Sequence, residues 1–282
     1  MIKNTFIHIP GIGKKSEKNL WQKGILTWDD FFARERDSHF PQAKIDRIKK
    51  QLEESMTRLS AGDARYFSER LPSQEQWRLF GEFRNTCAYL DIETTGLGNP
   101  GDYITCIALY ENSNVRHYVH GQNMEALADE LLNHKILITY NGKCFDVPFI
   151  SREFRMPVSH AQIDLRYVLK SLGYKGGLKG CEHQLGIGRH ELEGVDGYFA
   201  VLLWNDYQNN GNKKALETLL AYNIEDTVNL EKLMHIAYNK KLAETPFWSN
   251  KITEELPEVD RKFYADIETI TRIKEKYYGI GF

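Results

Sequence analysis

The sequence predicts an α/β fold in which a mixed β-sheet is flanked by helices. Apolar runs of strand length begin at residue 86 and are separated by turn residues such as Gly96 and the run 98–101. Further short strands then alternate with stretches of helical periodicity. Strands joined by short turns pair antiparallel, whereas strands joined through a helix pair in parallel. We therefore expect three antiparallel strands and two parallel ones in a single sheet.

The elements follow in chain order from the same periodicities. Residues 1–60 contain short amphipathic helical pieces, and residues 61–85 are polar with helical patches. Beyond them the pattern predicts strands at 86–91, 103–110, 115–120, 136–140 and 161–164, and helices at 124–133, 147–154 and from 165 to about 240. The expected domains are an N-terminal helical head (1–60), a linker (61–85), an α/β domain (86–240) and a helical C-terminal tail (241–282), with an amphipathic segment near 259–277.

The composition excludes several classes of protein. With 282 residues, 41% hydrophobic and 27% charged, the chain is not collagen-like, a long coiled coil or disordered. Its apolar runs are far shorter than the ~18 residues of a membrane span. Its four cysteines form no C-x-x-C pair that would indicate zinc or redox chemistry. We expect a cytoplasmic protein without a membrane partner.

The charge distribution favours a nucleic-acid partner at one end. Residues 1–60 hold 12 lysines and arginines against 8 acidic residues, whereas the whole chain carries a net charge of −2. A basic segment on an acidic body suits a polyanionic ligand. Solvated helical faces produce such imbalances too, and the charge alone leaves both interpretations open.

A pair of carboxylates follows the first predicted strand. Asp91 and Glu93 are two residues apart, so their side chains project from the same side of a strand. Converging carboxylates next to apolar residues are unfavourable unless a cation neutralises them, and oxygen ligands suit Mg²⁺ or Mn²⁺. The alternative is two exposed acids in a turn.

Two more acidic positions extend this pattern. Asp146 lies where the strand 136–140 gives way to a helix, and as an alternative it is a simple N-cap ahead of Pro148. Tyr222 and Asp226 are four residues apart and therefore share one face of a helix that begins near residue 213. The alternative for this pair is a buried tyrosine beside a solvated aspartate.

Taken together, three motifs resemble the DEDD superfamily of 3′–5′ exonucleases, which have an RNase H-like fold. The motifs are Asp-Ile-Glu-Thr-Thr-Gly-Leu at 91–97, Tyr-Asn-x-x-x-Phe-Asp-x-Pro at 140–148 and Tyr-x-x-x-Asp at 222–226. The second resembles the exonuclease domain of family B DNA polymerases. The third fits the tyrosine branch, because Ala221 occupies the position that carries histidine in the other branch. Segments 185–189 and 204–207 are similar to the YprB-type RNase H-like family.

This resemblance implies an enzyme that hydrolyses phosphodiester bonds with two divalent ions, Mg²⁺ or Mn²⁺. Asp91 would contact both ions, Glu93 and Asp226 would complete the nucleophile-side ion, and Asp146 would hold the second ion. Tyr222 would orient the attacking water.

Family position also implies contacts to the substrate. Thr95 and Leu97 would touch the terminal nucleotide, and Asn141 would position the substrate or a water. Near these motifs, Asp164 is expected to cap a helix, His183 and His190 to be surface histidines, and 175–180 to be a turn without phosphate-loop spacing.

The N-terminal head contains a Gly-Ile-Gly hairpin at 11–13 that resembles the helix-hairpin-helix motif. Such a hairpin holds a phosphate through backbone amides at a helix start, and Lys14 and Lys15 would add charge. Too few residues precede the hairpin for a full first helix. The alternative is a packing or partner-docking module.

We therefore expect a 3′–5′ exonuclease acting on nucleic acid, with single-stranded DNA favoured over RNA. The rival enzymes are an RNase H-like structure-specific endonuclease and an RNA exonuclease. A third hypothesis is a non-catalytic nucleic-acid-binding adaptor that has kept the fold. No sequence feature identifies a protein partner.

Overall fold

The computed structural model describes residues 1–188, 192 and 195–279. Its centre is a five-stranded sheet with the order β3-β2-β1-β4-β5, in which β1, β2 and β3 are antiparallel and β4 and β5 run parallel to β1. The strands are β1 (Cys87–Thr94), β2 (Ile104–Glu111), β3 (Asn114–Val119), β4 (Ile136–Thr139) and β5 (Ala161–Asp164). The predicted fold class is confirmed. Arg189, the last residue of the segment 185–189, and His190, expected at the surface, lie outside the described residues.

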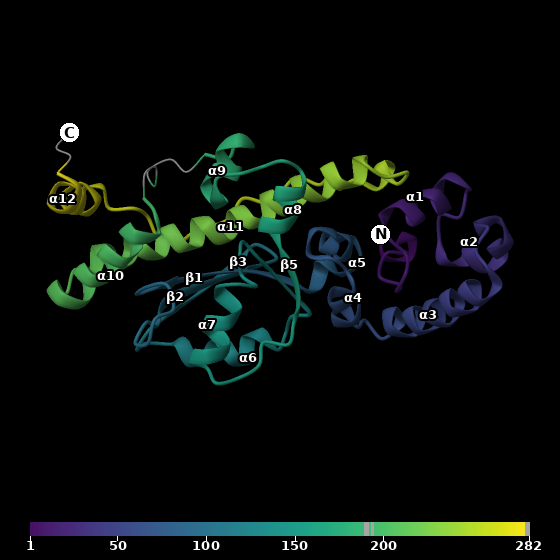
Figure 1. Ribbon diagram of the computed structural model, residues 1–282. Coiled ribbons are helices and arrows are strands. Elements are labelled where there is room, and N and C mark those ends of the chain that lie inside the picture. Colours follow the sequence, from purple (N-terminus) through teal and green to yellow (C-terminus); the bar gives the residue numbers. More distant parts are fainter. Residues whose placement is uncertain (189–191, 193–194, 280–282) are drawn as a thin grey trace.

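Helices cover both faces of the sheet (Figure 1). One face carries η5 (Met124–Ala126), α6 (Leu127–Leu131) and α7 (Asp146–Glu153). The other face is covered by the long helix α11 (Lys213–Ala243), which crosses the strands, and by α8 (Leu165–Ser171), α9 (Gly177–Gln184) and α10 (Gly197–Asn210).

The alternation of side chains along β1 decides which groups face α11. Ala88, Leu90 and Ile92 pack with the cluster that contains α6 and α7, whereas Tyr89 packs with the cluster on the α11 side. Because the strand repeats every two residues, the odd-numbered side chains at the end of β1 project toward α11. This alternation positions the acidic site.

The N-terminal segment is helical and packs against the rest of the chain. Its elements are η1 (Ile2–Asn4), α1 (Lys14–Gln22), α2 (Trp28–Ala33), η2 (Glu35–Ser38) and α3 (Gln42–Ser60), and the residues before β1 form α4 (Ala64–Arg70), η3 (Ser73–Leu79), α5 (Phe80–Phe83) and η4 (Arg84–Thr86). Arg78 in η3 donates to both carboxylate oxygens of Glu17 in α1 at 2.9 and 2.8 Å, and both side chains are buried. The predicted domain boundaries stay predictions.

The segment after α11 folds back along that helix. Asn239 and Ile252 exchange hydrogen bonds of 2.7 and 2.8 Å, and the chain passes η7 (Trp248–Asn250) before α12 (Ile267–Tyr278). Arg272 of α12 pairs with Asp206 of α10. Among the described residues, no helix combines the length and the apolar run that a membrane crossing needs.

One expected turn is wrong. Residues 175–180 were expected to form a turn, but α9 begins at Gly177. Gly176 takes a left-handed conformation (φ 93°) at the N-cap. Gly180 packs against the segment that precedes α9, where an added Cβ would lie 2.7 Å from the Lys175 carbonyl oxygen. Glycine therefore starts a closely packed helix at this point.

Candidate metal centre

Three carboxylates meet where β1 ends beneath α11. One oxygen from each of Asp91, Glu93 and Asp226 lies within 4.8 Å of the other two. Asp91 and Glu93 come from alternate positions of β1, and Asp226 comes from the middle of α11. Glu93 and Asp226 are buried. The expected alternatives, exposed acids in a turn for β1 and a solvated Asp226, are wrong.

Asp146 is a buried acid beside this group. It is the first residue of α7, whose N-cap is Phe145, so the expected simple N-cap role is wrong. Its side chain hydrogen-bonds the backbone of Ile92, between the two acids of β1, and its Oδ1 has no hydrogen-bond partner. Burial, with the charge of Asp164, raises the pKa of Asp146 to about 7.

The charges of these groups act most strongly on Asp91. Burial and the neighbouring carboxylates Asp146, Glu93 and Asp226 raise its pKa well above the usual range. A carboxyl among like charges is stabilised in its ionised form by a nearby cation. The all-oxygen donor set and the partnerless oxygen of Asp146 fit a divalent ion such as Mg²⁺ or Mn²⁺.

Asn223 is a member of the site that sequence reasoning missed. Its side chain is fully buried, and its Nδ2 donates to Asp91 Oδ2 at 2.8 Å and to the Asp91 carbonyl oxygen at 3.2 Å. Asn223 lies three residues before Asp226 and shares its helix face. That spacing was visible in the sequence, but it did not indicate which carboxylate the amide would contact.

Tyr222 lies next to Asn223 on α11. Its side chain is buried in a cluster that joins α10, α11 and α12 to the sheet, and Lys179 Nζ lies 4.6 Å from the ring centroid. The Lys179 ammonium also donates to the Val195 carbonyl oxygen. Tyr222 lies four residues before Asp226 on α11 and therefore shares a face of that helix with it.

A second layer of contacts supports the β4–α7 turn. Asp164 caps α8 as expected, accepting from the Arg166 amide at 3.0 Å, and it also accepts from the Asn141 amide at 2.8 Å. Asn141 has a left-handed backbone (φ 69°), and its carboxamide oxygen accepts from the Arg166 guanidinium. Asp164 thus holds the turn that leads to Asp146, while the Asn141 side chain is engaged by Arg166.

The two predicted contacts after β1 differ in their surroundings. The Thr95 hydroxyl accepts from the Tyr103 amide at 3.1 Å, which closes the loop between β1 and β2. Leu97 is 88% exposed, although it is a large apolar side chain. Thr95 therefore shapes this loop, and Leu97 is presented at its surface.

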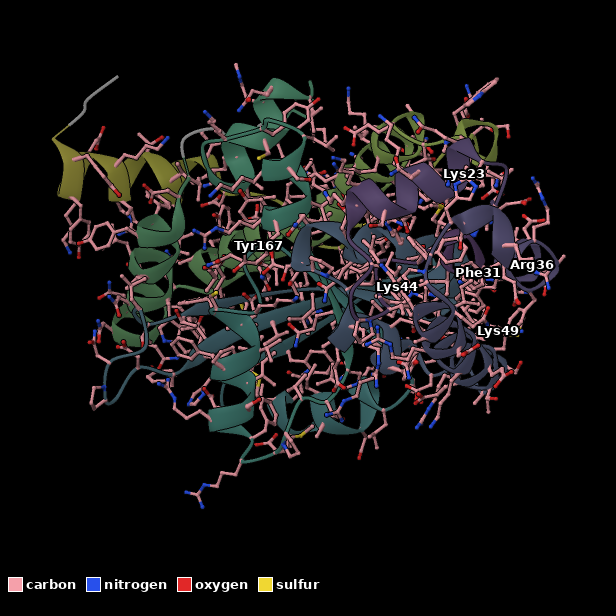
Figure 2. All side chains as sticks on the ribbon, turned by 45° about the vertical axis from the view of Figure 1, so that its right-hand side comes forward. Lys23, Phe31, Arg36, Lys44, Lys49 and Tyr167 are labelled. Carbon is pink, nitrogen blue, oxygen red and sulfur yellow. The ribbon has the colours of Figure 1, made fainter. Side chains whose placement is uncertain are left out.

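The predicted lysines of the head are placed at the start of α1. Lys14 pairs with the buried Glu75, while Lys15 is exposed. Lys44 of α3 donates to the Gly11 carbonyl oxygen at 3.3 Å, which adds a third ammonium to the hairpin. Figure 2 labels Lys44 with other basic residues of the head, arranged around the buried Phe31.

Comparison with known proteins gives one family. Residues 88–238, more than half of the chain, match the model of the RNase H superfamily. Among solved structures, the family B DNA polymerase from the hyperthermophilic archaeon Pyrobaculum calidifontis is similar over 58% of this chain and 26% of its own, with a TM-score of 0.44 and 16% sequence identity. No curated protein matches the sequence.

Proposed function

Because the chain belongs to the RNase H superfamily, we propose that it is a metal-dependent 3′–5′ exonuclease that hydrolyses phosphodiester bonds, with single-stranded DNA as its preferred substrate. The observation that carries this proposal is the meeting of Asp91, Glu93 and Asp226, with Asp146 beside them, at the end of β1. Several buried carboxylates close together destabilise the folded chain unless cations neutralise them, and this arrangement suits a site that holds divalent ions.

Four carboxylates would hold two ions, Mg²⁺ or Mn²⁺. Asp91, whose pKa is raised by all three other acids, would contact both ions, Glu93 and Asp226 would complete one, and Asp146 would hold the other. When bound, such a pair supplies a nucleophile at neutral pH and stabilises charge on the attacking and leaving oxygens.

The remaining residues of the site would orient these groups. The Tyr222 hydroxyl would hydrogen-bond the attacking water and fix its direction toward phosphorus. Asn223 would keep the Asp91 carboxylate oriented, because its Nδ2 donates to Asp91 Oδ2. Asp164 would maintain the turn from which Asp146 projects.

The substrate would be held at two places. The exposed Leu97 would contact the terminal base, next to the loop closed by Thr95, and Asn141 with Arg166 would lie near the strand's phosphates. We further propose that residues 86–240 carry the chemistry and that residues 1–60 hold the nucleic-acid backbone through the hairpin before Lys14 and Lys15.

Single substitutions of the acids test the proposal. Asp91→Asn, Glu93→Gln, Asp146→Asn and Asp226→Asn should each abolish degradation of single-stranded DNA, because the proposed chemistry needs both ions and each acid would hold at least one of them. Thermal unfolding without metal should show no loss of stability, since each change removes like-charge repulsion. Asp129→Asn, an exposed position in α6 on the opposite face of the sheet, is the control and should keep activity. Full activity in any of the four variants would remove that residue from the site.

A further inference from the structure

A second cluster of potential metal ligands lies on the opposite face of the sheet. Glu111 ends β2, Glu130 lies in α6 and His134 precedes β4. In β2, Ile107 and Leu109 pack with α6 and α7, so Glu111 projects to that face, whereas Asp91 projects toward α11. The register pairs Asp91 with Ala108, three residues before Glu111. The two clusters are therefore separate sites.

The ring of His134 points into this cluster. The side chain is 2% exposed, its Nδ1 is 3.4 Å from Glu111 Oε2, and its Nε2 is 3.6 Å from Glu130 Oε1. Both distances are too long for well-formed hydrogen bonds, and Nε2 is a buried atom without a hydrogen-bond partner. One ligand atom from each of the three residues lies within 4.8 Å of the others. Each ring nitrogen thus faces one of the two carboxylates, and the buried Nε2 has no hydrogen-bond partner.

The charges of the cluster are incompletely balanced. Arg116 Nη1 lies 2.7 Å from Glu111 Oε1 and 3.1 Å from Glu130 Oε1, and it supplies one positive charge to two carboxylates. The two carboxylates therefore carry one more charge than Arg116 supplies. The carboxylates are 19% and 18% exposed, so an ion has access from solvent, and Arg116 is 40% exposed and has room to move aside.

We propose that Glu111, Glu130 and His134 form a second cation site that takes a transition-metal dication of the Zn²⁺ type. One imidazole nitrogen and two carboxylate oxygens are a three-ligand set that Zn²⁺ accepts, with water in the open position. The all-oxygen cluster at Asp91 suits Mg²⁺ or Mn²⁺ instead, because imidazole favours the later transition metals. The ion binds in competition with the Arg116 guanidinium.

Binding at this site joins three elements. Glu111 belongs to the end of β2, Glu130 to α6 and His134 to the turn that enters β4. An ion that binds only the folded chain raises its stability by mass action. Bound Zn²⁺ therefore stabilises the packing of β2, α6 and the turn before β4. This site lies on the opposite face of the sheet from the acids that we assign to phosphodiester hydrolysis.

Calorimetric titration of the full chain with Zn²⁺ tests the proposal. The Asp91→Asn/Asp226→Asn variant serves as background, because it removes the first cluster from the titration. We expect one Zn²⁺ per chain and a rise in the unfolding temperature. His134→Gln should remove Zn²⁺ binding. Glu130→Gln should remove it too, and this variant provides the test if His134→Gln fails to fold.

Two further variants distinguish this cation site from an ion-pair network and from a cysteine site. Arg116→Gln should tighten Zn²⁺ binding, since it removes the competing guanidinium, whereas a structural ion-pair network would only lose stability. Cys144 carries an exposed thiol that could bind Zn²⁺ on its own. If the cation binds at Glu111, Glu130 and His134 instead, Cys144→Ser should leave Zn²⁺ binding unchanged. Absence of Zn²⁺ binding in the background variant, or binding that survives His134→Gln and Glu130→Gln, would overturn the proposal.

Discussion

Asp91 is the residue on which the interactions of the acidic site converge. Its charge is opposed by Asp146, Glu93 and Asp226, and Asn223, a neutral donor, stabilises its ionised form. Hydrogen bonds to a charged group contribute ~1.5–3 kcal/mol, more than those between neutral groups. The orientation of Asp91 therefore depends on Asn223 more than on any other contact described for its side chain.

Replacing Asn223 with alanine should weaken the site without unfolding the protein. The Asp91 carboxylate loses its 2.8 Å hydrogen bond and is free to rotate. The lost interaction of ~1.5–3 kcal/mol corresponds to roughly 10- to 100-fold. We expect the Mg²⁺ concentration for half-maximal activity to rise by such a factor, measured beside the unfolding temperature. If activity falls at every Mg²⁺ concentration in step with stability, Asn223 is a packing residue only.

Replacing Tyr222 with phenylalanine should lower turnover while leaving metal affinity nearly intact. The ring keeps its packing under Lys179, and only the hydroxyl that we propose to orient water is lost. Loss of one positioning contact costs ~10²–10⁴ in rate, and we expect the lower end. Single-turnover cleavage with Mn²⁺ measures the rate, and calorimetry measures the metal. Tyr207→Phe, on α10, is the control; a wild-type rate in Tyr222→Phe would leave Tyr222 without a role in chemistry.

At the residue scale, the sequence predicted the acids better than the residues that support them. Asp91 with Glu93, and Tyr222 with Asp226, follow from the periods of a strand and a helix, which depend on local geometry alone. The contact of Asn223 with Asp91 depends on how α11 lies over β1, which no local period gives. The same holds for Glu111 and His134, which are 23 residues apart in the sequence.

At the scale of elements, the predicted strands agree with the structure to within a few residues. Apolar runs bounded by turn residues define β1 to β5, because burial on both faces leaves little room for polar residues. The segment before β1 was harder to predict. Its polar residues include Arg78 and Glu75, which are buried because they pair with each other at 2.9 Å and Arg78 also pairs with Glu17. The polarity of residues 61–85 therefore indicated a linker with helical patches, whereas these side chains are buried.

Removing one member of this buried pair should destabilise the contact between α1 and η3. Glu17→Gln leaves Arg78 buried with one carboxylate fewer, and breaking a buried ion pair costs ~3–5 kcal/mol. Denaturant unfolding measures the loss. The control is Arg65→Gln, which breaks the exposed pair with Glu69 and should cost no more than ~1 kcal/mol. Equal losses in the two variants would show that the Arg78 pair does not stabilise the fold.

At the scale of the whole molecule, the head and the acidic site belong to one connected structure. One apolar cluster includes Trp28 and Phe67 near the N-terminus together with Tyr89 of β1 and Val228 of α11. Figure 1 places the head at one end of α11 and α12 at the other. Nucleic acid bound at the hairpin before α1 would therefore keep a fixed relation to the site.

Neutralising the hairpin should weaken binding and change its salt dependence. For the variant Lys15→Gln/Lys44→Gln we expect lower affinity for single-stranded DNA and a slope of log K against log salt that is shallower by about 0.7 for each lost phosphate contact. Fluorescence anisotropy at several salt concentrations measures both. Lys276→Gln in α12 removes the same kind of charge far from the head and should leave the slope unchanged. An unaltered slope in the double variant would show that the hairpin does not contact phosphates.

The polarity of digestion tests the central claim most directly. A single-stranded DNA oligonucleotide labelled at its 5′ end is incubated with the full chain and Mg²⁺ or Mn²⁺, beside an RNA of the same sequence and samples with EDTA. We predict a ladder of 5′-labelled products that shortens by one nucleotide at a time, requires the metal and disappears in Asp91→Asn. A discrete internal cut would indicate an endonuclease, and an intact oligonucleotide that is still bound would indicate an adaptor; either result contradicts the assignment as a 3′–5′ exonuclease.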